Sequence, residues 1–530
     1  MLEEGAFVLE SASMFLAVLG SWRRRYVLAM SLAASCVPLP LARAQELSHQ
    51  RRFENPVAAL ARSDQELTTE INANPNDAES FRRRGLIRLQ QERVTDAISD
   101  LQTAVRLETQ SSQAHTDLAT ALFDGGRQRE AIGEARQAVS LDERSFAAEA
   151  LLGRLLVVTA GDTHEAIQHM SRSLDLNADQ PDLRFDLINA LRAVKDYSAA
   201  GVQVRVLGVS LPPGDWRREY SEASIDLDLG HPAAATLHLR RALKTNPNFV
   251  PAQQDLAAAL IQLGRWQEAS EILGPLINQQ PQSEQLAYMD ALVLENTHHP
   301  EAAEAEANRA IGLNPKSSEA YVARGISQAL QGRHADAVNS LERAVSLQPG
   351  SFDAHFYLGR ERYALNDATG AAQALRSAVQ LRLQDAEARF LLGTALESAG
   401  DKESAMEQYR ELVRLRPDDP RGHIGLGGIL LRYGKRDEAM AELTKARSLD
   451  PKNFETAMNI GKILAKDGNL DESIRYLREA SQAEPSSPEA HYQLALALKR
   501  AGHDAEAARE FAEVNRLNQQ RRGVPPASPN

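Results

Sequence analysis

Two histidine pairs are the first residues whose types and spacing could do chemistry. The segment HEAIQH carries His164 and His169 five residues apart. Two histidines that bind one zinc ion from a single helix stand four residues apart, because that spacing puts both rings on one face. We therefore expect no metal at this pair. The second pair, His298 and His299, is expected in a solvated turn between two helices.

The glycine-rich segment GHIGLGG, residues 422–428, is a second candidate because glycine loops can cradle phosphate groups. Such a loop follows a strand, which is not expected here, and the G-x-G-x-x-G pattern fails at Leu430. Gly427 is instead expected at a helix packing position. No G-x-S-x-G, Walker lysine or H-E-x-x-H motif occurs, and the single cysteine, Cys36, excludes an intramolecular disulfide or a multi-cysteine metal site. The sequence thus predicts no catalytic residue, no metal and no cofactor.

A 34-residue period organises most of the chain. In each unit one column, called here the small-residue column, holds mostly glycine or alanine. A second column twelve residues later is almost always alanine, and the unit commonly closes at a proline. Small side chains let antiparallel helices pack closely, and proline stops a helix, so each unit is predicted to be a helix pair. In the C-terminal half the small-residue column is Gly325, Gly359, Gly393, Gly427 and Gly461, and the second column includes Ala337, Ala371, Ala405 and Ala439.

This pattern resembles the tetratricopeptide repeat family, with about thirteen repeats over residues 78–517. The resemblance implies an all-α fold, a right-handed α-solenoid superhelix of antiparallel helix pairs, whose concave groove is lined mainly by the first helices. A single pair cannot bury its apolar stripe alone, so neighbouring repeats must bury it. Two repeats, at about 181–248, lack glycine in the small-residue column, and PPGDW interrupts the turn between them, so a kink is expected there.

The N-terminal segment differs in composition from the repeats. Within residues 1–44 a basic stretch precedes an apolar one, which is the pattern of a secretory signal peptide cleaved before Gln45. An uncleaved membrane segment and a lipoprotein acylated at Cys36 are the alternatives, and either Met1 or Met14 is the start. We expect export to the periplasm or cell envelope, with membrane contact only through an uncleaved N-terminal segment.

Two shorter segments flank the repeats. Residues 45–77 are expected to form a linker and a capping helix, because part of this stretch resembles a solitary second helix. Residues 518–530 are expected to form a disordered tail. The net charge of −12 argues against nucleic acid as a partner, because nucleic-acid binding needs a basic face.

A row of large side chains three residues before the small-residue column is the first candidate for partner binding. Equivalent positions stack along a solenoid, so the row could form an apolar stripe for an extended peptide or a partner helix. Equally, such a column can simply hold the helices together. The members singled out are Tyr288, Phe356, Phe390 and Tyr492.

The inner positions of the last repeats carry the second candidate, a set of cations. Lys462 and Lys466 share a helix face because they are four residues apart. A basic groove would favour an acidic segment, a C-terminal carboxylate or an anionic glycan. Charge on a helix face is otherwise commonly only solvated. The cations are Arg360, Arg432, Lys462, Lys466, Lys499 and Arg500.

The sequence therefore predicts a non-catalytic scaffold that binds an extended or helical segment of a protein or peptide partner in its concave groove. By resemblance, such a scaffold would serve cell-envelope assembly, secretion or polysaccharide export. The alternative is a substrate-selecting or regulatory arm of an enzyme complex, such as a glycosyltransferase system with catalysis on another chain.

Overall fold

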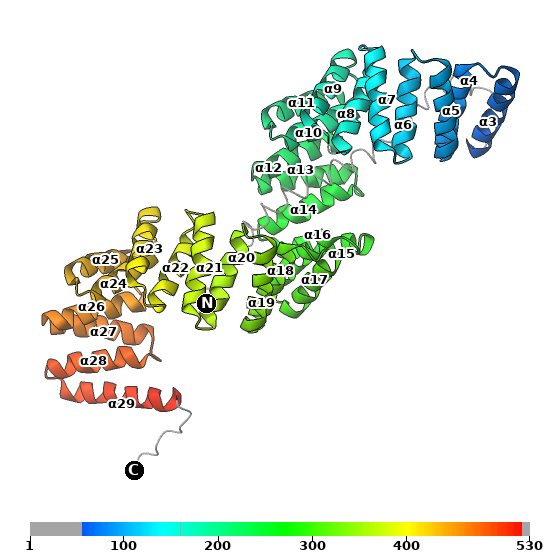
Figure 1. Ribbon diagram of the computed structural model, residues 1–530. Helices are drawn as coiled ribbons and strands as arrows, with labels where there is room; N and C mark the ends of the chain where they lie inside the picture. The colour runs from blue at the N-terminus through cyan, green and yellow to red at the C-terminus, as the bar shows by residue number, and fades with distance from the viewer. Residues whose placement is uncertain (1–55, 160, 522–530) are drawn as a thin grey trace. The chain divides into compact units, whose positions relative to one another are not determined.

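The computed structural model describes residues 56–159 and 161–521 (Figure 1). The expected signal or membrane segment, residues 1–44, lies outside the described residues, as do 45–55 of the linker and 522–530 of the tail. Every regular element in the described part of the chain is an α-helix, which confirms the predicted all-α fold. None of the described helices combines the length and the apolar character that a membrane crossing requires.

The first compact unit, Met1–Pro281, contains a solitary helix followed by six helix pairs in its described part. The two helices of each pair pack against each other, and each pair packs against the next. The helices are α3 (Pro56–Ala73), α4 (Ala78–Gln90), α5 (Val94–Leu107), α6 (Ser112–Asp124), α7 (Gln128–Leu141), α8 (Phe146–Val158), α9 (Thr163–Leu176), α10 (Pro181–Ala193), α11 (Tyr197–Ser210), α12 (Trp216–Asp228), α13 (Pro232–Thr245), α14 (Val250–Gln262) and α15 (Trp266–Gln279).

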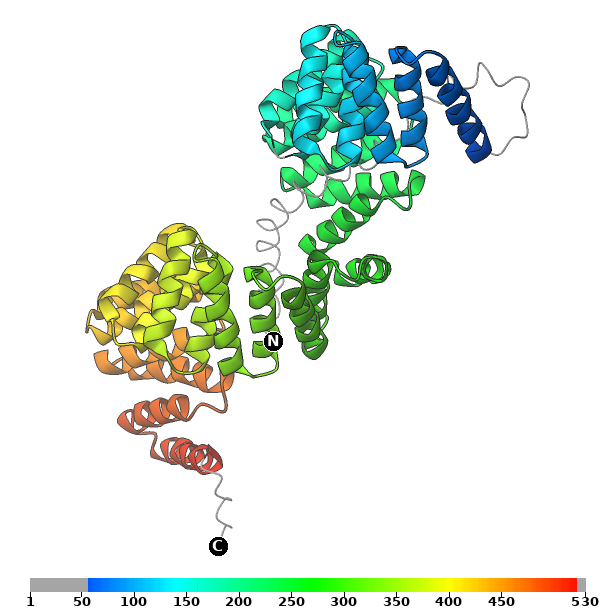
Figure 2. The same cartoon turned by 45° about the vertical axis from the view of Figure 1, so that its right-hand side comes forward.

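The second compact unit, Gln282–Asn530, contains seven helix pairs in its described part, packed in the same way. The thirteen pairs of the two units match the number of repeats predicted, and Figure 2 shows the succession from a second direction. The helices are α16 (Glu284–Asn296), α17 (Pro300–Leu313), α18 (Ser318–Leu330), α19 (His334–Leu347), α20 (Phe352–Ala364), α21 (Ala368–Leu381), α22 (Ala386–Ser398), α23 (Lys402–Leu415), α24 (Pro420–Arg432), α25 (Arg436–Leu449), α26 (Phe454–Asp467), α27 (Leu470–Ala483), α28 (Pro488–Arg500) and α29 (Asp504–Arg521).

The last helix is longer than the repeat pattern predicts. The repeats were expected to end at residue 517 and a disordered tail to begin at 518, but α29 continues to Arg521. The first four residues of the expected tail, 518–521, are therefore helical.

The small-residue column lies where the two helices of a pair touch. A Cβ atom added to Gly325 would stand 2.7 Å from Cγ of Leu341, and one added to Gly461 would stand 2.6 Å from Cγ of Leu477. Such distances are too short for two carbon atoms, so a larger residue would push the helices apart. Gly427 occupies the same position, against Leu443 of its own pair, as its place in the column predicts.

In twelve of the thirteen pairs the turn between the two helices contains a described residue with positive φ. Glycine supplies it at Gly332 and Gly400, with φ of 74° and 87°, because glycine has no Cβ to clash. Asn366 and His298 occupy the same kind of position with φ of 61°. His298 and His299 are both exposed in the turn between α16 and α17, where a solvated turn was predicted.

An aromatic cluster holds together the two repeats at about 181–248, where the sequence predicts a kink. The ring of Trp216 at the start of α12 lies 5.5 Å from that of Phe185 and 4.3 Å from that of Phe249, between ring centroids. Tyr220 completes the cluster, 4.9 Å from Phe249, and is fully buried. Three successive repeats are thus joined by aromatic contacts around the PPGD turn. The kink was expected at this turn, whereas the division between the two compact units falls after Pro281.

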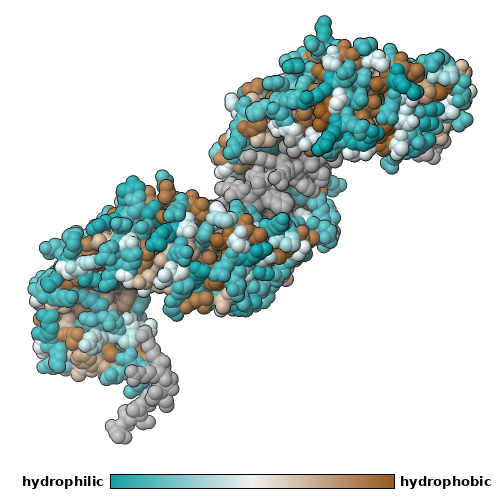
Figure 3. Space-filling model, viewed as in Figure 1, coloured by the Kyte–Doolittle hydropathy of each residue, from teal (hydrophilic) through white to brown (hydrophobic). Residues whose placement is uncertain are grey.

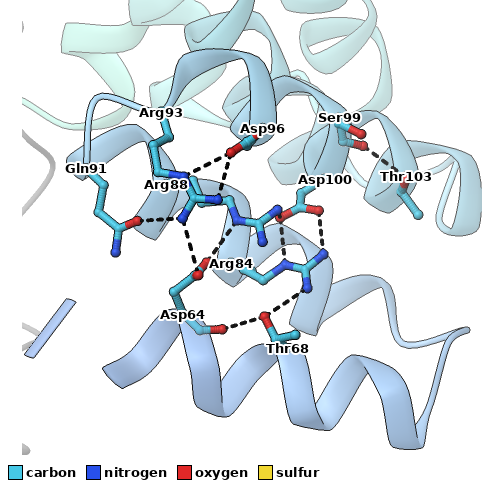
Figure 4. Close-up of polar contacts among 10 residues, drawn as sticks. All are labelled: Asp64, Thr68, Arg84, Arg88, Gln91, Arg93, Asp96, Ser99, Asp100 and Thr103. Carbon is cyan, nitrogen blue, oxygen red and sulfur yellow. Dashed lines mark hydrogen bonds and ion pairs between the residues drawn. The ribbon is translucent and has the colours of Figure 1, made fainter. Parts of the chain in front are cut away.

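Helix α3 is joined to the first repeat by a network of ion pairs (Figure 4). Arg84 of α4 donates hydrogen bonds of 2.8 Å and 2.7 Å to the two carboxylate oxygens of Asp100 in α5. Arg88 bridges Asp100 and Asp64 of α3, at 2.8 Å from each. Arg84 and Asp100 are buried, and buried charges are tolerated only when they are paired. Helix α3 thereby covers the open side of α4, in the place expected of a capping helix.

The visible surface fits this arrangement. On the face shown in Figure 3 the described residues are mainly hydrophilic, with apolar residues in scattered patches. This distribution is what a solenoid produces when the apolar stripe of each helix is buried between its neighbours.

Candidate functional site

The second unit contains a hollow of about 620 Å³ on three successive first helices, α22, α24 and α26. Most of its lining comes from these first helices, on the face where the repeat pattern predicts the groove. Tyr363 of α20, the start of α28 and the ring of Tyr409 from α23 complete it. Its volume falls within the roughly 300–1,000 Å³ typical of ligand pockets.

The hollow exists because two side chains are missing from its floor. Gly425 and Gly428 both line it from α24. A Cβ at Gly425 would stand 2.6 Å from Cε1 of Tyr409, so this glycine lets the ring approach the backbone. A Cβ at Gly428 would meet nothing closer than Nδ2 of Asn459, at 3.8 Å, so this position opens into free space.

Apolar side chains border the floor. Phe390 of α22 is half-buried and its ring lies 6.3 Å from that of Tyr409, between ring centroids. Ile424 of α24 and Met458 of α26 present small parts of buried side chains to the hollow. Phe390, Ile424 and Met458 all belong to the row of large side chains three residues before the small-residue column.

The cations around the hollow are already paired. Arg432 forms an ion pair with Glu397 of the preceding repeat, and the lysine Nζ of Lys462 lies 3.0 Å from the Glu489 carboxylate of the following repeat. Arg421 pairs with Asp419 at 2.8 Å and also with Glu387. Each of these cations is therefore at least partly neutralised by a neighbouring carboxylate.

Glu455 differs from the other carboxylates of the hollow. In the described part of the chain it has no cation within ion-pair distance. Partial desolvation raises the pKa of its carboxyl group, and the nearby charge of Glu397 raises it further, against the opposing effect of Arg432. The Glu455 side chain is exposed, so an incoming cation can reach its carboxylate.

The structure brings three of the residues singled out in the sequence into the hollow: Phe390, Arg432 and Lys462. Two others face the protein interior, because the side chains of Tyr288 and Phe356 are only 2% and 3% exposed. The expected stripe is therefore not continuous at the surface. Tyr288 and Phe356 pack between helices, which corrects their assignment as exposed partner-binding residues.

The other singled-out residues lie outside the hollow. Tyr492 on α28 is 42% exposed, and its ring packs against that of Phe511 at 6.0 Å. Arg360 lies over the ring of Tyr357, 4.9 Å from its centroid, and contacts Glu361 at 3.3 Å.

The last three cations lie at the ends of α26 and α28. Arg500 donates a 2.6 Å hydrogen bond to the backbone oxygen of Ala465. Lys466 and Lys499 are exposed, and in the described residues neither has a carboxylate within ion-pair distance. Only these two of the six predicted cations therefore match the idea of a basic surface ready for an acidic partner.

The sequence interpretation missed the residues that create the hollow. It explained the segment GHIGLGG through Gly427 alone and left Gly425 and Gly428 without a role. The signal was present, since both glycines fall at inner positions of a first helix where neighbouring repeats carry larger residues. The sequence interpretation also gave no role to Asn459, which faces the open space over Gly428.

Five histidines of the described residues join the two helices of a pair. Nδ1 of His115, His423 and His491 lies 2.6 Å from a glutamate oxygen nineteen residues later, on the second helix of the same pair. In two further repeats the order is reversed, and His169 and His238 on the second helix meet a glutamate on the first. The recurrence at equivalent positions indicates a structural role.

One group of described residues has the composition of a metal site, namely Glu219, Glu222 and His238. His238 and Glu219, 2.8 Å apart, are one of the recurring histidine–glutamate pairs. Arg218 and Arg241 also contact the two carboxylates, at 3.1 Å and 3.8 Å. Because these cations already balance the acidic charge, the cluster is explained as a helix–helix contact.

The repeat architecture is matched by family comparison. Tetratricopeptide repeat models match residues 82–148, 116–181, 226–293, 288–353, 331–385, 356–420, 392–454, 424–483 and 458–518. These matches cover well over half of the chain. The chain belongs to the tetratricopeptide repeat family. No curated protein matches this chain.

Several solved tetratricopeptide repeat structures resemble parts of this array. A chain of the APC/C hetero-tetramer Cut9–Hcn1 is 13% identical, with 80% of this chain and 96% of that chain covered and a TM-score of 0.46. YrrB, described as a TPR protein with an unusual peptide-binding site, is 22% identical over 35% of this chain and 95% of its own, with a TM-score of 0.32. MamA is 25% identical over 31% of this chain and 95% of its own, with a TM-score of 0.29.

Tetratricopeptide repeat proteins are generally protein-interaction scaffolds and are typically non-catalytic. The hollow has features that suit the binding of a peptide segment. It offers an apolar surface, paired charges and a side-chain amide, which can position a bound segment.

Proposed function

We propose that this tetratricopeptide repeat protein is a non-catalytic scaffold that binds an extended segment of a partner protein in the groove of its second unit. The observation that carries the proposal is the hollow on α22, α24 and α26. Its floor has no side chain at Gly428, so an incoming side chain can reach the helix backbone there, while Gly425 admits the ring of Tyr409 beside it. Apolar anchors in such pockets commonly provide most of the binding energy of an interface.

Polar groups around the hollow support an extended rather than a compact occupant. The side-chain amide of Asn459 makes no hydrogen bond within the described residues, and it faces the space over Gly428. An extended main chain presents N–H and C=O groups along its length, and these need partners when they are removed from water. Asn459 can donate to and accept from such groups.

We further propose that the protein acts in the periplasm or cell envelope, in assembly, secretion or polysaccharide export. The support is the basic stretch followed by an apolar stretch within residues 1–44. Mass spectrometry of the mature protein tests this localisation. A first peptide that begins at Gln45 supports export, and an N-terminus at Met1 or Met14 contradicts cleavage.

The binding proposal can be tested with a variant that fills the hollow. Gly428→Leu adds a side chain where the structure has free space, so the fold should tolerate it. The tagged full-length chain and this variant would be used to capture partners from envelope extract, and the captured proteins quantified by mass spectrometry. At least one specific partner is expected to be lost with Gly428→Leu.

A matched control is available in the same unit. Gly312 of α17 is exposed and has nothing within 4 Å of an added Cβ, so Gly312→Leu makes the same chemical change away from the hollow. The control should capture the same partners as the unmodified chain. Equal capture by Gly428→Leu and Gly312→Leu would contradict binding in the hollow.

A further inference from the structure

The charge balance of the hollow differs from the basic groove that the sequence suggests. The described lining of the hollow holds three carboxylates and three cations, and two further carboxylates outside the lining, Glu387 and Asp419, pair with Arg421. The lining carboxylates are Glu397, Glu455 and Glu489, and the cations are Arg421, Arg432 and Lys462. An excess of negative charge in a partly enclosed groove attracts positive charge and repels acidic segments.

The excess charge is located at one place. Arg432 is held by Glu397 and Lys462 by Glu489, which leaves the Glu455 carboxylate without a cation among the described residues. Glu455 lies in the first turn of α26, one turn before Met458, and both line the hollow. A cation bound by Glu455 would therefore lie directly beside the apolar wall.

The apolar part of the hollow sets the second requirement. Its floor of Gly425 and Gly428 and its border of Phe390, Ile424 and Met458 form a surface that only an apolar group can cover without losing hydrogen bonds. The hollow, at about 620 Å³, has room for a large side chain together with a stretch of main chain.

From these two features we infer that the hollow binds a peptide segment in which a bulky apolar side chain is followed or preceded closely by lysine or arginine. The apolar side chain occupies the space over Gly428, and the cation pairs with Glu455. This inference rests on the proposed function and names the chemistry of the partner at the same site. It replaces the acidic partner that the sequence favours.

The test uses the full-length chain and a display library of random short peptides. Peptides selected on the unmodified chain are expected to combine a large apolar residue with lysine or arginine one or two positions away. Synthetic labelled copies would then be titrated by fluorescence polarisation. Gly428→Leu should abolish their binding, while Gly312→Leu should leave it unchanged.

The charge requirement is tested by Glu455→Gln. Loss of a charge-assisted hydrogen bond should weaken the basic peptides about tenfold and reduce the salt dependence of their binding. Glu319→Gln is the matched control, because Glu319 holds the equivalent place in α18 and lies outside the hollow. Replacing the lysine or arginine of the peptide by glutamine should weaken binding as much as Glu455→Gln does. The two changes together should weaken binding little more than either change alone.

The outcomes separate the two proposals. Selected peptides that lack basic residues, or basic peptides unaffected by Glu455→Gln, would overturn the inference about charge while Gly428→Leu still supports binding in the hollow. Peptides that bind Gly428→Leu as well as the unmodified chain would contradict the proposed function itself. A library that yields no peptide at all would count against both.

Discussion

Glu295 shows how a single residue of a repeat can depend on its surroundings more than on its type. It lies on α16, its side chain is 3% exposed, and burial raises the pKa of its carboxyl group to about 8. Ser327 Oγ is 3.0 Å from Glu295 Oε1 and 2.9 Å from the Ala323 carbonyl oxygen. Ser327 has one proton to donate, so a protonated Glu295 that donates to Ser327 Oγ satisfies all three groups.

The raised pKa of Glu295 predicts a pH-dependent stability. An unfolded chain releases this proton near pH 4.5, whereas the folded chain keeps it up to about pH 8. Between pH 4.5 and about pH 8 folding is therefore accompanied by the uptake of a proton. The free energy of unfolding should fall as the pH rises through this range. Burial raises the pKa of Asp290 and Asp353 to about 6, so both add to the same trend.

Glu295→Gln should remove much of this dependence. At pH 8 the variant should be more stable than the unmodified chain by on the order of a few kcal/mol, since a tenfold change in proton affinity corresponds to about 1.4 kcal/mol. Thermal unfolding measured between pH 5 and 8 gives the comparison, with the exposed Glu407→Gln as control. Parallel pH profiles for Glu295→Gln and the control would show that Glu295 does not titrate in this range.

At the scale of the element, the helix pair depends on the small-residue column. A Cβ at Gly393 of α22 would stand 2.7 Å from Cε1 of Tyr409 in α23. The Tyr409 ring is buried and its hydroxyl lies near Thr394 and Glu397, so it has little room to move. The pair therefore cannot admit a side chain without moving its two helices apart.

Gly393→Leu should destabilise the protein by about 1–3 kcal/mol through overpacking. Circular dichroism during heating would show a lower melting temperature. Gly312→Leu is again the control, because it adds the same side chain in open space and gains up to roughly 0.8 kcal/mol of helix propensity. If Gly393→Leu had the same melting temperature as the unmodified chain, the assignment of Gly393 to the contact between α22 and α23 would be wrong.

At the scale of the whole molecule, the chain consists of two compact units, each with a core built only from neighbouring pairs. The first unit's main cluster runs through α5 to α11, and one cluster of the second unit joins α26 to α29. In such arrays stability is a sum of repeat and nearest-neighbour terms. A local defect should therefore weaken its own neighbourhood and leave distant repeats intact.

Two equivalent substitutions test this locality. Gly85→Leu would crowd Leu101 in the first unit, and Gly461→Leu would crowd Leu477 in the second, at 2.7 Å and 2.6 Å from the added Cβ. Hydrogen exchange should accelerate in α3–α7 for the first variant and in α24–α29 for the second. Faster exchange throughout both units in either variant would contradict a nearest-neighbour architecture.

Much of the fold was predictable from the sequence because its causes are local. The 34-residue period, the proline breaks and the small-residue column all concern contacts within one repeat or between adjacent ones. Gly325 and Gly461 illustrate this, since each touches a leucine sixteen residues later on the second helix of its own pair. The number of repeats follows from the same pattern.

The candidate site could be predicted only in part. Phe390, Arg432 and Lys462 were singled out from their columns, and the structure places them in the hollow. Tyr288 belongs to the same row as Phe390, but it is buried because its neighbours cover it. A column specifies which face of a helix a residue occupies, and it does not specify what covers that face.

The sequence by itself determined the helix pairs and their number, because these depend on steric contacts repeated within each unit, and the face of the groove was what the family resemblance implied. Only the tertiary structure decided the chemistry of that groove. Arg432 meets Glu397 thirty-five residues away, and Lys462 meets Glu489 in the next repeat. Whether a cation is free or paired depends on how successive repeats stack, and this stacking left the Glu455 carboxylate beside an open floor of glycine.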